Sequence, residues 1–211
     1  MRTLTRGDER ERLARYQEQR WADVPARFFA DRGLDHSTVA RFGLGYTGDE
    51  GRSRSRDLRR CLVLPYEDGL GRLRKLRYRP LYTTSGAKYL DEQDADVHLF
   101  AVRAIDNPVV YVCEGEIDTM TAWQCGFRAV GVPGVASFKD EWKYLFRPPH
   151  VDRVVLAFDP DKAGRDASKY LYGLLRKQID VSIAKLPDGL DVNDLLVKHG
   201  EKAVKEVLSV G

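Results

Sequence analysis

The 211-residue sequence has few cysteines and no long apolar run. Cys61, Cys113 and Cys125 stand far apart and form no Cys-x-x-Cys pair, so we expect neither zinc in this chain nor a disulfide framework. No apolar stretch approaches the roughly 18 residues that a membrane helix needs. The first residues mix acids and bases around no apolar core, which excludes a signal or transit peptide. These absences predict a cytoplasmic protein with no membrane partner.

What the chain does contain is typical of a folded protein with two compact units. Hydrophobic residues make up 43% of the sequence and charged residues 32%, which is ordinary for a globular chain. Because domains typically hold about 100 to 150 residues, a chain of this length can form two small cores.

The net charge of +3 hides an uneven distribution of basic residues. Between residues 52 and 79 ten basic side chains stand against three acidic ones, a surplus of seven. A solvated surface is the alternative, but such surfaces usually mix signs, and nearby tyrosines favour a nucleic-acid phosphate backbone. The ten are Arg52, Arg54, Arg56, Arg59, Arg60, Arg72, Arg74, Lys75, Arg77 and Arg79.

The first half of the sequence predicts short helices that lead into a small antiparallel sheet. Apolar spacing over residues 8–31 indicates two helices, and Asp35 or Ser37 is a candidate N-cap for a third. Asp68-Gly69 joins two apolar runs, which is a hairpin signal. The second run does not alternate strictly, and a bulge would explain the slip. We assign residues 1–107 to this basic α+β subdomain.

From Pro108 onward apolar strands alternate with helical segments. This alternation predicts a parallel sheet with helices on both faces, an α/β fold that occupies residues 108–211. The expected helices lie within residues 114–126, 140–146, 163–177 and 192–208.

Two aspartates directly follow the apolar run that ends at Phe158. Asp159 and Asp161 stand at the carboxyl end of this strand, where parallel α/β sheets bind ligands. Carboxylates there suit Mg²⁺, which prefers oxygen ligands. The alternative is that Asp159 only ends the strand and Asp161 caps the following helix.

Further acids follow two other predicted strands. Glu114 follows one strand immediately, and Asp118 lies one helical turn later, where it could equally complement the helix dipole. A third group, Asp188, Asp191, Asn193 and Asp194, follows the last strand and could form turns and caps. Carboxylates packed together repel strongly outside bulk water. A shared metal ion is therefore the simplest explanation for three acidic groups at one sheet edge.

These three segments resemble the signature segments of a TOPRIM domain. They read Glu114-Gly-Glu-Ile-Asp118, Asp159-Pro-Asp161-Lys-Ala-Gly164 and Leu-Pro-Asp-Gly-Leu-Asp191. Their sequences are most similar to those of DnaG-type bacterial primases and of the primase halves of phage helicase-primases. The similarity extends upstream to Lys88-Tyr-Leu-Asp91 and covers roughly residues 28–200.

The resemblance implies roles for particular residues. Glu114, Asp159 and Asp161 would be catalytic and hold Mg²⁺ or Mn²⁺, with Asp118 and Asp191 as supporting ligands. The nucleotide and nucleic-acid contacts would come from five basic residues, Arg60, Arg77, Arg79, Lys88 and Lys162.

The sequence also departs from the family pattern. Cys61 stands where an arginine is usual, so Arg60 could substitute only by shifting. Asp91 replaces the usual asparagine, and Asn193 stands where a carboxylate often lies. A zinc ribbon and a helicase-binding region are not evident, so we expect a zinc-bearing module and a replicative helicase to be partners on other chains, whether this is an excised core or a compact phage primase.

The resemblance implies a DNA primase polymerase core, a nucleotidyltransferase of DNA replication. It would make short RNA primers on a single-stranded DNA template from ribonucleoside triphosphates, with metal ions lowering the cost of developing charge. A TOPRIM nuclease and a non-catalytic single-strand-binding recombination mediator remain alternatives. The chain is too short for a topoisomerase with a strand-passing gate.

Overall fold

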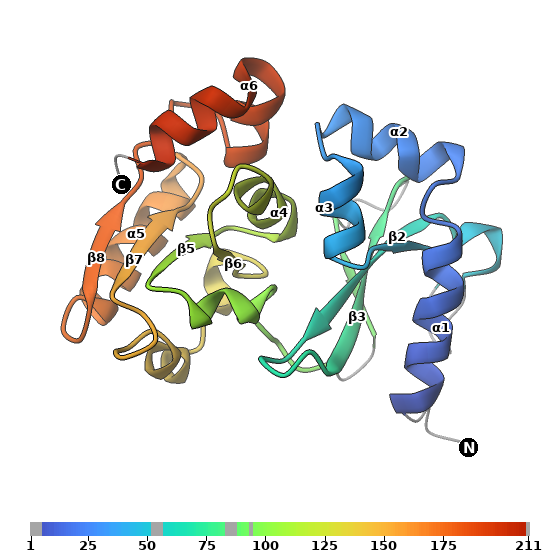
Figure 1. The fold of residues 1–211 in the computed structure, drawn as a ribbon, viewed down its shortest axis with the longest axis horizontal. Coiled ribbons are helices and arrows are strands. Elements are labelled where there is room, and N and C mark those ends of the chain that lie inside the picture. Colours follow the sequence, from blue (N-terminus) through green and yellow to red (C-terminus); the bar gives the residue numbers. More distant parts are fainter. Residues whose placement is uncertain (1–5, 52–56, 83–87, 93–94, 210–211) are drawn as a thin grey trace. The chain divides into compact units, whose positions relative to one another are not determined.

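The computed structural model describes residues 6–51, 57–82, 88–92 and 95–209. The chain divides into two compact units, Met1–Asp96 and Val97–Gly211, and each has its own four-stranded sheet (Figure 1). The structure groups residues 97–107 with the second unit because Leu99, Ala104 and Ile105 belong to that unit's core. Among the described residues, no helix is both long and apolar enough to span a membrane.

The first unit places three helices before an antiparallel sheet of order β1-β2-β3-β4. Asp35 is the N-cap of the third helix and accepts a hydrogen bond from the Thr38 backbone N–H at 2.6 Å. The elements are α1 (Arg6–Glu18), α2 (Asp23–Asp31), α3 (His36–Arg41), β1 (Gly45–Tyr46), β2 (Cys61–Glu67), β3 (Leu73–Pro80) and β4 (Leu90–Asp91), with a 3₁₀ turn η1 (Gly48–Glu50) after β1.

The hairpin of β2 and β3 carries the expected bulge. The register shifts between Tyr66 and Glu67, which restores alternation along β3. Leu76 and Tyr78 then point into the core under α1. By the two-residue period of a strand, Lys75, Arg77 and Arg79 lie on the opposite face.

The second unit is the expected parallel α/β sheet, of order β6-β5-β7-β8. Its strands are β5 (Val109–Cys113), β6 (Ala129–Gly131), β7 (Arg153–Ala157) and β8 (Asp180–Ile183), and its α-helices are α4 (Glu116–Gln124), α5 (Lys162–Leu175) and α6 (Val192–Ser209). Short 3₁₀ segments are η2 (Val102–Asp106), η3 (Val135–Ser137) and η4 (Asp140–Leu145).

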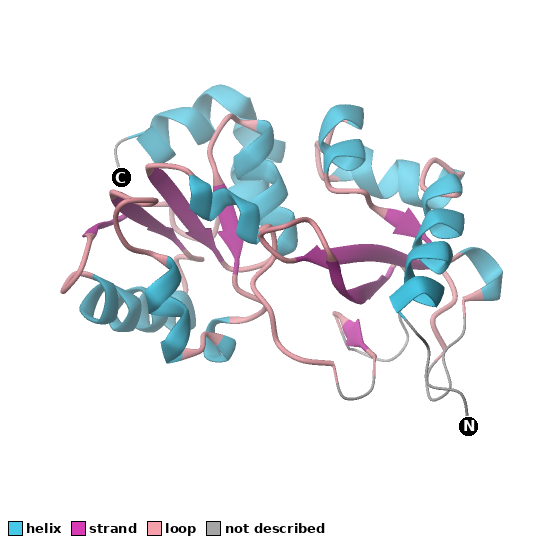
Figure 2. Ribbon diagram, turned by 60° about the horizontal axis from the view of Figure 1, so that its bottom comes forward, coloured by secondary structure: helices cyan, strands magenta, loops and turns pink. Residues whose placement is uncertain are grey.

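Helices cover both faces of this sheet, as Figure 2 shows. Val112 and Leu156 pack with Leu171 of α5 in one core. Cys113 and Ala157, the next residues along the same strands, pack in the other core with the helices α4 and α6. Buried side chains on both faces explain why the strands read as continuous apolar runs.

Two expected helices differ in detail from the prediction. Residues 140–145 form a 3₁₀ helix, η4, rather than an α-helix. The C-terminal helix α6 is kinked at Gly200, whose φ of 81° only glycine adopts readily.

All three cysteines are free and buried. Burial raises the pKa of Cys61 to about 12 and that of Cys125 to about 11, and it raises the pKa of Cys113 well above its usual value. Since the thiolate is the reactive form, we expect negligible labelling of the folded protein by Ellman's reagent at pH 8 and three reactive thiols in urea. Rapid labelling of the folded chain would contradict the burial described here.

Candidate metal centre

The predicted acidic segments meet at one edge of the parallel sheet. Strands β5 and β7 are hydrogen-bonded neighbours, and Cys113 pairs with Ala157 in their register. Glu114 follows the first of these strands directly, and Asp159 comes two residues after the end of the second. Both therefore stand at the carboxyl edge, where α/β sheets bind ligands.

Three carboxylates from distant parts of the chain come together there. Asp118 in the first turn of α4, Asp159 after β7 and Asp191 before α6 each offer one oxygen, and these oxygens lie within 4.8 Å of one another. Asp118 is 9% exposed, and the other two are half-buried. We call these three residues the carboxylate cluster.

Backbone amides hold two members of the cluster in place. The N–H of Asn193 donates to Asp118 Oδ1 at 3.0 Å, and the N–H of Asp194 donates to Asp191 Oδ1 at 2.5 Å. Asn193 is buried, and its side-chain amide donates to Thr121 Oγ1 at 2.9 Å. The start of α6 is thereby fixed against α4, with Asp191 also serving as a helix cap.

Two glycines shape the turns beside the cluster, one by close packing and one by its backbone conformation. A Cβ on Gly164 would lie 2.2 Å from the carbonyl oxygen of Asp159, so only glycine allows α5 to start against this strand end. Gly115, with a φ of 143°, makes the turn from β5 into α4 in a conformation that other residues rarely adopt. These constraints explain why glycine occupies both positions in the two signature segments.

Glu114 and Asp161 do not belong to the three-residue cluster found among the described residues. Asp161 is the N-cap of α5, and its Oδ1 accepts a hydrogen bond from the Gly164 N–H at 2.8 Å. Glu114 is half-buried at the end of β5. Their roles as metal ligands therefore stay predictions, whereas the two residues expected only to support the site, Asp118 and Asp191, meet Asp159.

The cluster concentrates negative charge beside a buried strand. Burial raises the pKa of the Cys113 thiol, and the charges of Asp118 and Asp159 raise it further. Like charges at such distances repel by several kcal/mol outside bulk water. Because the donors are all carboxylate oxygens, the set fits a hard divalent cation such as Mg²⁺ or Mn²⁺.

In the first unit, three cations of β3 lie against aromatic rings, and we call Lys75, Arg77 and Arg79 the cation row. Lys75 lies 4.8 Å from the Tyr66 ring centroid. Arg79 donates to the hydroxyl of Tyr89 at 2.9 Å and lies over the ring of Phe28. Arg77 lies 4.5 Å from the Tyr89 ring centroid. The cation row thus has a flat aromatic lining.

Asp91 is the acid within this row. It pairs with Lys75 at 2.8 Å and with Arg77 at 3.4 Å. The sequence interpretation missed Phe28 and Tyr89 as ring partners of Arg79, since only the pairing of β3 with β4 and the position of α2 bring them together.

The remaining predicted basic residues are exposed. Arg60 has a φ of 55° and pairs with Asp49 at 2.6 Å, Lys88 precedes β4, and Lys162 is the first residue of α5. Of the ten basic residues between positions 52 and 79, three lie outside the described residues, namely Arg52, Arg54 and Arg56.

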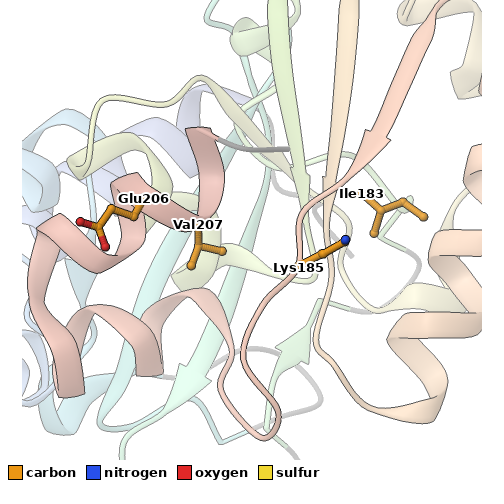
Figure 3. A pocket seen from close by; sticks show the side chains of 4 residues that line it. All are labelled: Ile183, Lys185, Glu206 and Val207. Carbon is orange, nitrogen blue, oxygen red and sulfur yellow. The ribbon is translucent and has the colours of Figure 1, made fainter.

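The second unit also has a pocket beside its edge strand β8. It is lined by Ile183, Lys185, Glu206 and Val207 (Figure 3). Its lining residues include no member of the carboxylate cluster, and its one cation and one anion give no clear preference for a charged ligand.

The contact at Gly164 gives a direct test of the site's geometry. We expect Gly164→Ala to destabilise the fold by about 1–3 kcal/mol, because the new methyl group collides with the Asp159 backbone, and to weaken stabilisation by Mn²⁺. Gly173→Ala on the same helix is the control, since its Cβ meets nothing within 4 Å; it should be neutral or stabilising by up to about 1 kcal/mol. Urea unfolding with and without Mn²⁺ measures both, and equal effects would refute the tight packing at Asp159.

Comparisons with known proteins agree with this geometry. Residues 111–196 match a family model described as Toprim-like. The DNA primase of Clostridium acetobutylicum is 27% identical over 215 residues, which cover 84% of this chain and 36% of that protein. The Gene 57 protein of Mycobacterium phage D29 is 35% identical over 95 residues, covering 45% of this chain and 59% of that protein.

A solved structure of the DnaG catalytic core has the same fold. The two chains are 25% identical with a TM-score of 0.75, and the match covers 94% of this chain and 77% of the other. The chain spans well under half the length of the curated primases that it matches. Residues 111–196 are therefore Toprim-like, and over most of its length the chain is similar in sequence to bacterial DNA primases and in fold to the DnaG catalytic core, with a further similarity to a phage protein.

Proposed function

We propose that this chain is the polymerase core of a DNA primase, which makes short RNA primers on single-stranded DNA from ribonucleoside triphosphates. The observation that carries the proposal is the meeting of Asp118, Asp159 and Asp191 within 4.8 Å at the carboxyl edge of a Toprim-like sheet. A basic, aromatic-lined unit in the same chain supports it.

The carboxylate cluster would hold Mg²⁺ or Mn²⁺. When bound, such an ion neutralises charge on the nucleotide triphosphate and on the attacking and leaving oxygens. Asp159 comes from the strand end itself, and the other two ligands are tied to the start of α6 by backbone hydrogen bonds. This preorganisation keeps three mutually repelling groups in place without requiring motion of the sheet.

Glu114 and Asp161 complete the proposed catalytic set. Glu114 stands at the same edge, one strand away from Asp159, and would act as a further ligand or as the general base that takes the proton of the 3′-hydroxyl. Asp161 uses Oδ1 to cap α5, and its second oxygen would contribute to metal binding. Lys162, which begins α5, would contact nucleotide phosphate.

The first unit would bind the template. Arg77 and Arg79 supply positive charge, and Tyr89 and Phe28 beside them supply flat rings for bases, while Arg60 and Lys88 add exposed cations. Such surfaces bind single strands with strong salt dependence and little sequence preference. A solved structure similar to this chain is that of a DnaG primase catalytic domain bound to single-stranded DNA.

The primase relatives are longer than this chain. The alignment with the Clostridium primase covers 36% of that protein. We propose that a replicative helicase and a zinc-bearing module supply what this core does not, such as the choice of start site.

The proposal is tested by RNA synthesis. With single-stranded template, labelled ribonucleotides and Mg²⁺ or Mn²⁺, we expect short oligoribonucleotides from the wild-type chain. Asp159→Asn should lower their yield by about 100-fold or more, because several kcal/mol of charge stabilisation depend on the metal. Asp166→Asn, which removes an acid of α5 outside the cluster, should leave synthesis unchanged.

Asp161→Asn separates the capping of α5 from metal binding, because asparagine caps a helix as well as aspartate does.

The same assay separates the alternative functions. Metal-dependent cutting without incorporation would indicate a nuclease, and DNA binding without synthesis in any metal would favour a mediator. Undiminished synthesis by Asp159→Asn would contradict the proposed site.

A further inference from the structure

The outer face of α5 is strongly and almost uniformly basic. From Lys162 to Lys177 the chain has five basic residues and one acid, Asp166. All five basic residues are exposed. They are Lys162, Arg165, Lys169, Arg176 and Lys177.

Four of these cations and one tyrosine form a straight stripe along the helix. The buried side of α5 consists of Gly164, Ser168, Leu171 and Leu175. The spacing of three or four residues puts Lys162, Arg165, Lys169, Tyr172 and Arg176 on one exposed line. At 1.5 Å per residue this line is roughly 21 Å long. We call it the α5 stripe.

The α5 stripe differs from the exposed face of α6, which is an ordinary solvated helix surface. On α6 each of three lysines has an acid one turn away, in the pairs Lys198–Asp194, Lys202–Glu206 and Lys205–Glu201. The stripe's cations form no ion pair with any residue in the described part of the chain. Arg165 donates instead to the carbonyl of Pro160, and Arg176 lies over the Tyr172 ring at 5.7 Å.

One end of the stripe lies at the carboxylate cluster. Lys162 follows Asp161 directly, and Gly164 packs against the backbone of Asp159, so the stripe begins at the proposed metal centre. Its other end lies about three to four turns farther along α5. A charged ligand at the cluster could therefore extend along the helix without leaving the second unit.

We propose that the α5 stripe binds the phosphate backbone of a single-stranded nucleic acid that enters or leaves the metal centre. This inference rests on the proposed function and adds a second contact surface to the basic face of the first unit. Four cations spread over roughly 21 Å could contact several successive phosphates of one strand. Tyr172, which lies beside Arg176 and is 37% exposed, would add an aromatic ring for stacking with a base.

Salt dependence of DNA binding tests the proposal. The variant Arg165→Gln, Lys169→Gln, Arg176→Gln removes three cations of the stripe but retains Lys162 next to the metal centre. The control variant Lys198→Gln, Lys202→Gln, Lys205→Gln removes three lysines of α6, so both variants lose the same net charge. Fluorescence anisotropy with a labelled oligothymidylate, over a range of NaCl concentrations, gives the slope of log affinity against log salt.

The slope is negative, and each phosphate contact on a single strand contributes about 0.7 to its magnitude. We therefore expect the loss of three contacts in the stripe variant to reduce that magnitude by about two. The α6 variant should keep the wild-type slope. A second measurement uses the wild-type chain: bound oligonucleotide should protect Lys162 and Lys169 from acetylation but not Lys198 and Lys202.

Equal slopes in the two variants, or a wild-type chain that does not bind the oligonucleotide, would overturn the inference. Its failure is distinguishable from failure of the proposed function. Equal slopes with intact primer synthesis would refute nucleic-acid binding by the α5 stripe alone. A slope reduced only in the stripe variant, without nucleotide incorporation by the wild-type chain, would support the stripe and refute the polymerase function.

Discussion

The repulsion among three carboxylates is the constraint on which the second unit depends. Asp118, Asp159 and Asp191 bring oxygens within 4.8 Å of one another, an arrangement that opposes folding unless something offsets it. Backbone N–H groups at the start of α6 offset part of the repulsion. In the proposed function a divalent cation would offset the rest, so that metal binding and correct packing of α4, α5 and α6 would stabilise each other.

The parallel sheet makes this convergence possible. Strands that run side by side in one direction end at one edge, and the short turns after β5 and β7 keep the acids there. Gly115 and Gly164 are the residues that allow such close turns. From the same edge a stripe of cations that pair with no described acid extends along α5, whereas three lysines of α6 each pair with an acid.

Much of this could be predicted from the sequence because it depends on local patterns. The strand and helix alternation, the bulge near Tyr66 and the acids at strand ends all follow from residue spacing. The residue spacing did not predict which of the acids would meet. Asp118 and Asp191 join Asp159 because Asn193 fixes α6 against α4. That contact links residues 75 apart in the chain. In the same way, the rings beside Arg79 come from α2 and from the segment before β4.

Manganese binding followed by electron paramagnetic resonance tests the central claim most directly, because free and bound Mn²⁺ give different signals. The account predicts saturable binding by the wild-type chain and its loss in the isosteric double variant Asp118→Asn, Asp159→Asn, which can still accept the hydrogen bond from Asn193. Equal Mn²⁺ binding by the two proteins would contradict the claim that these carboxylates form the metal centre.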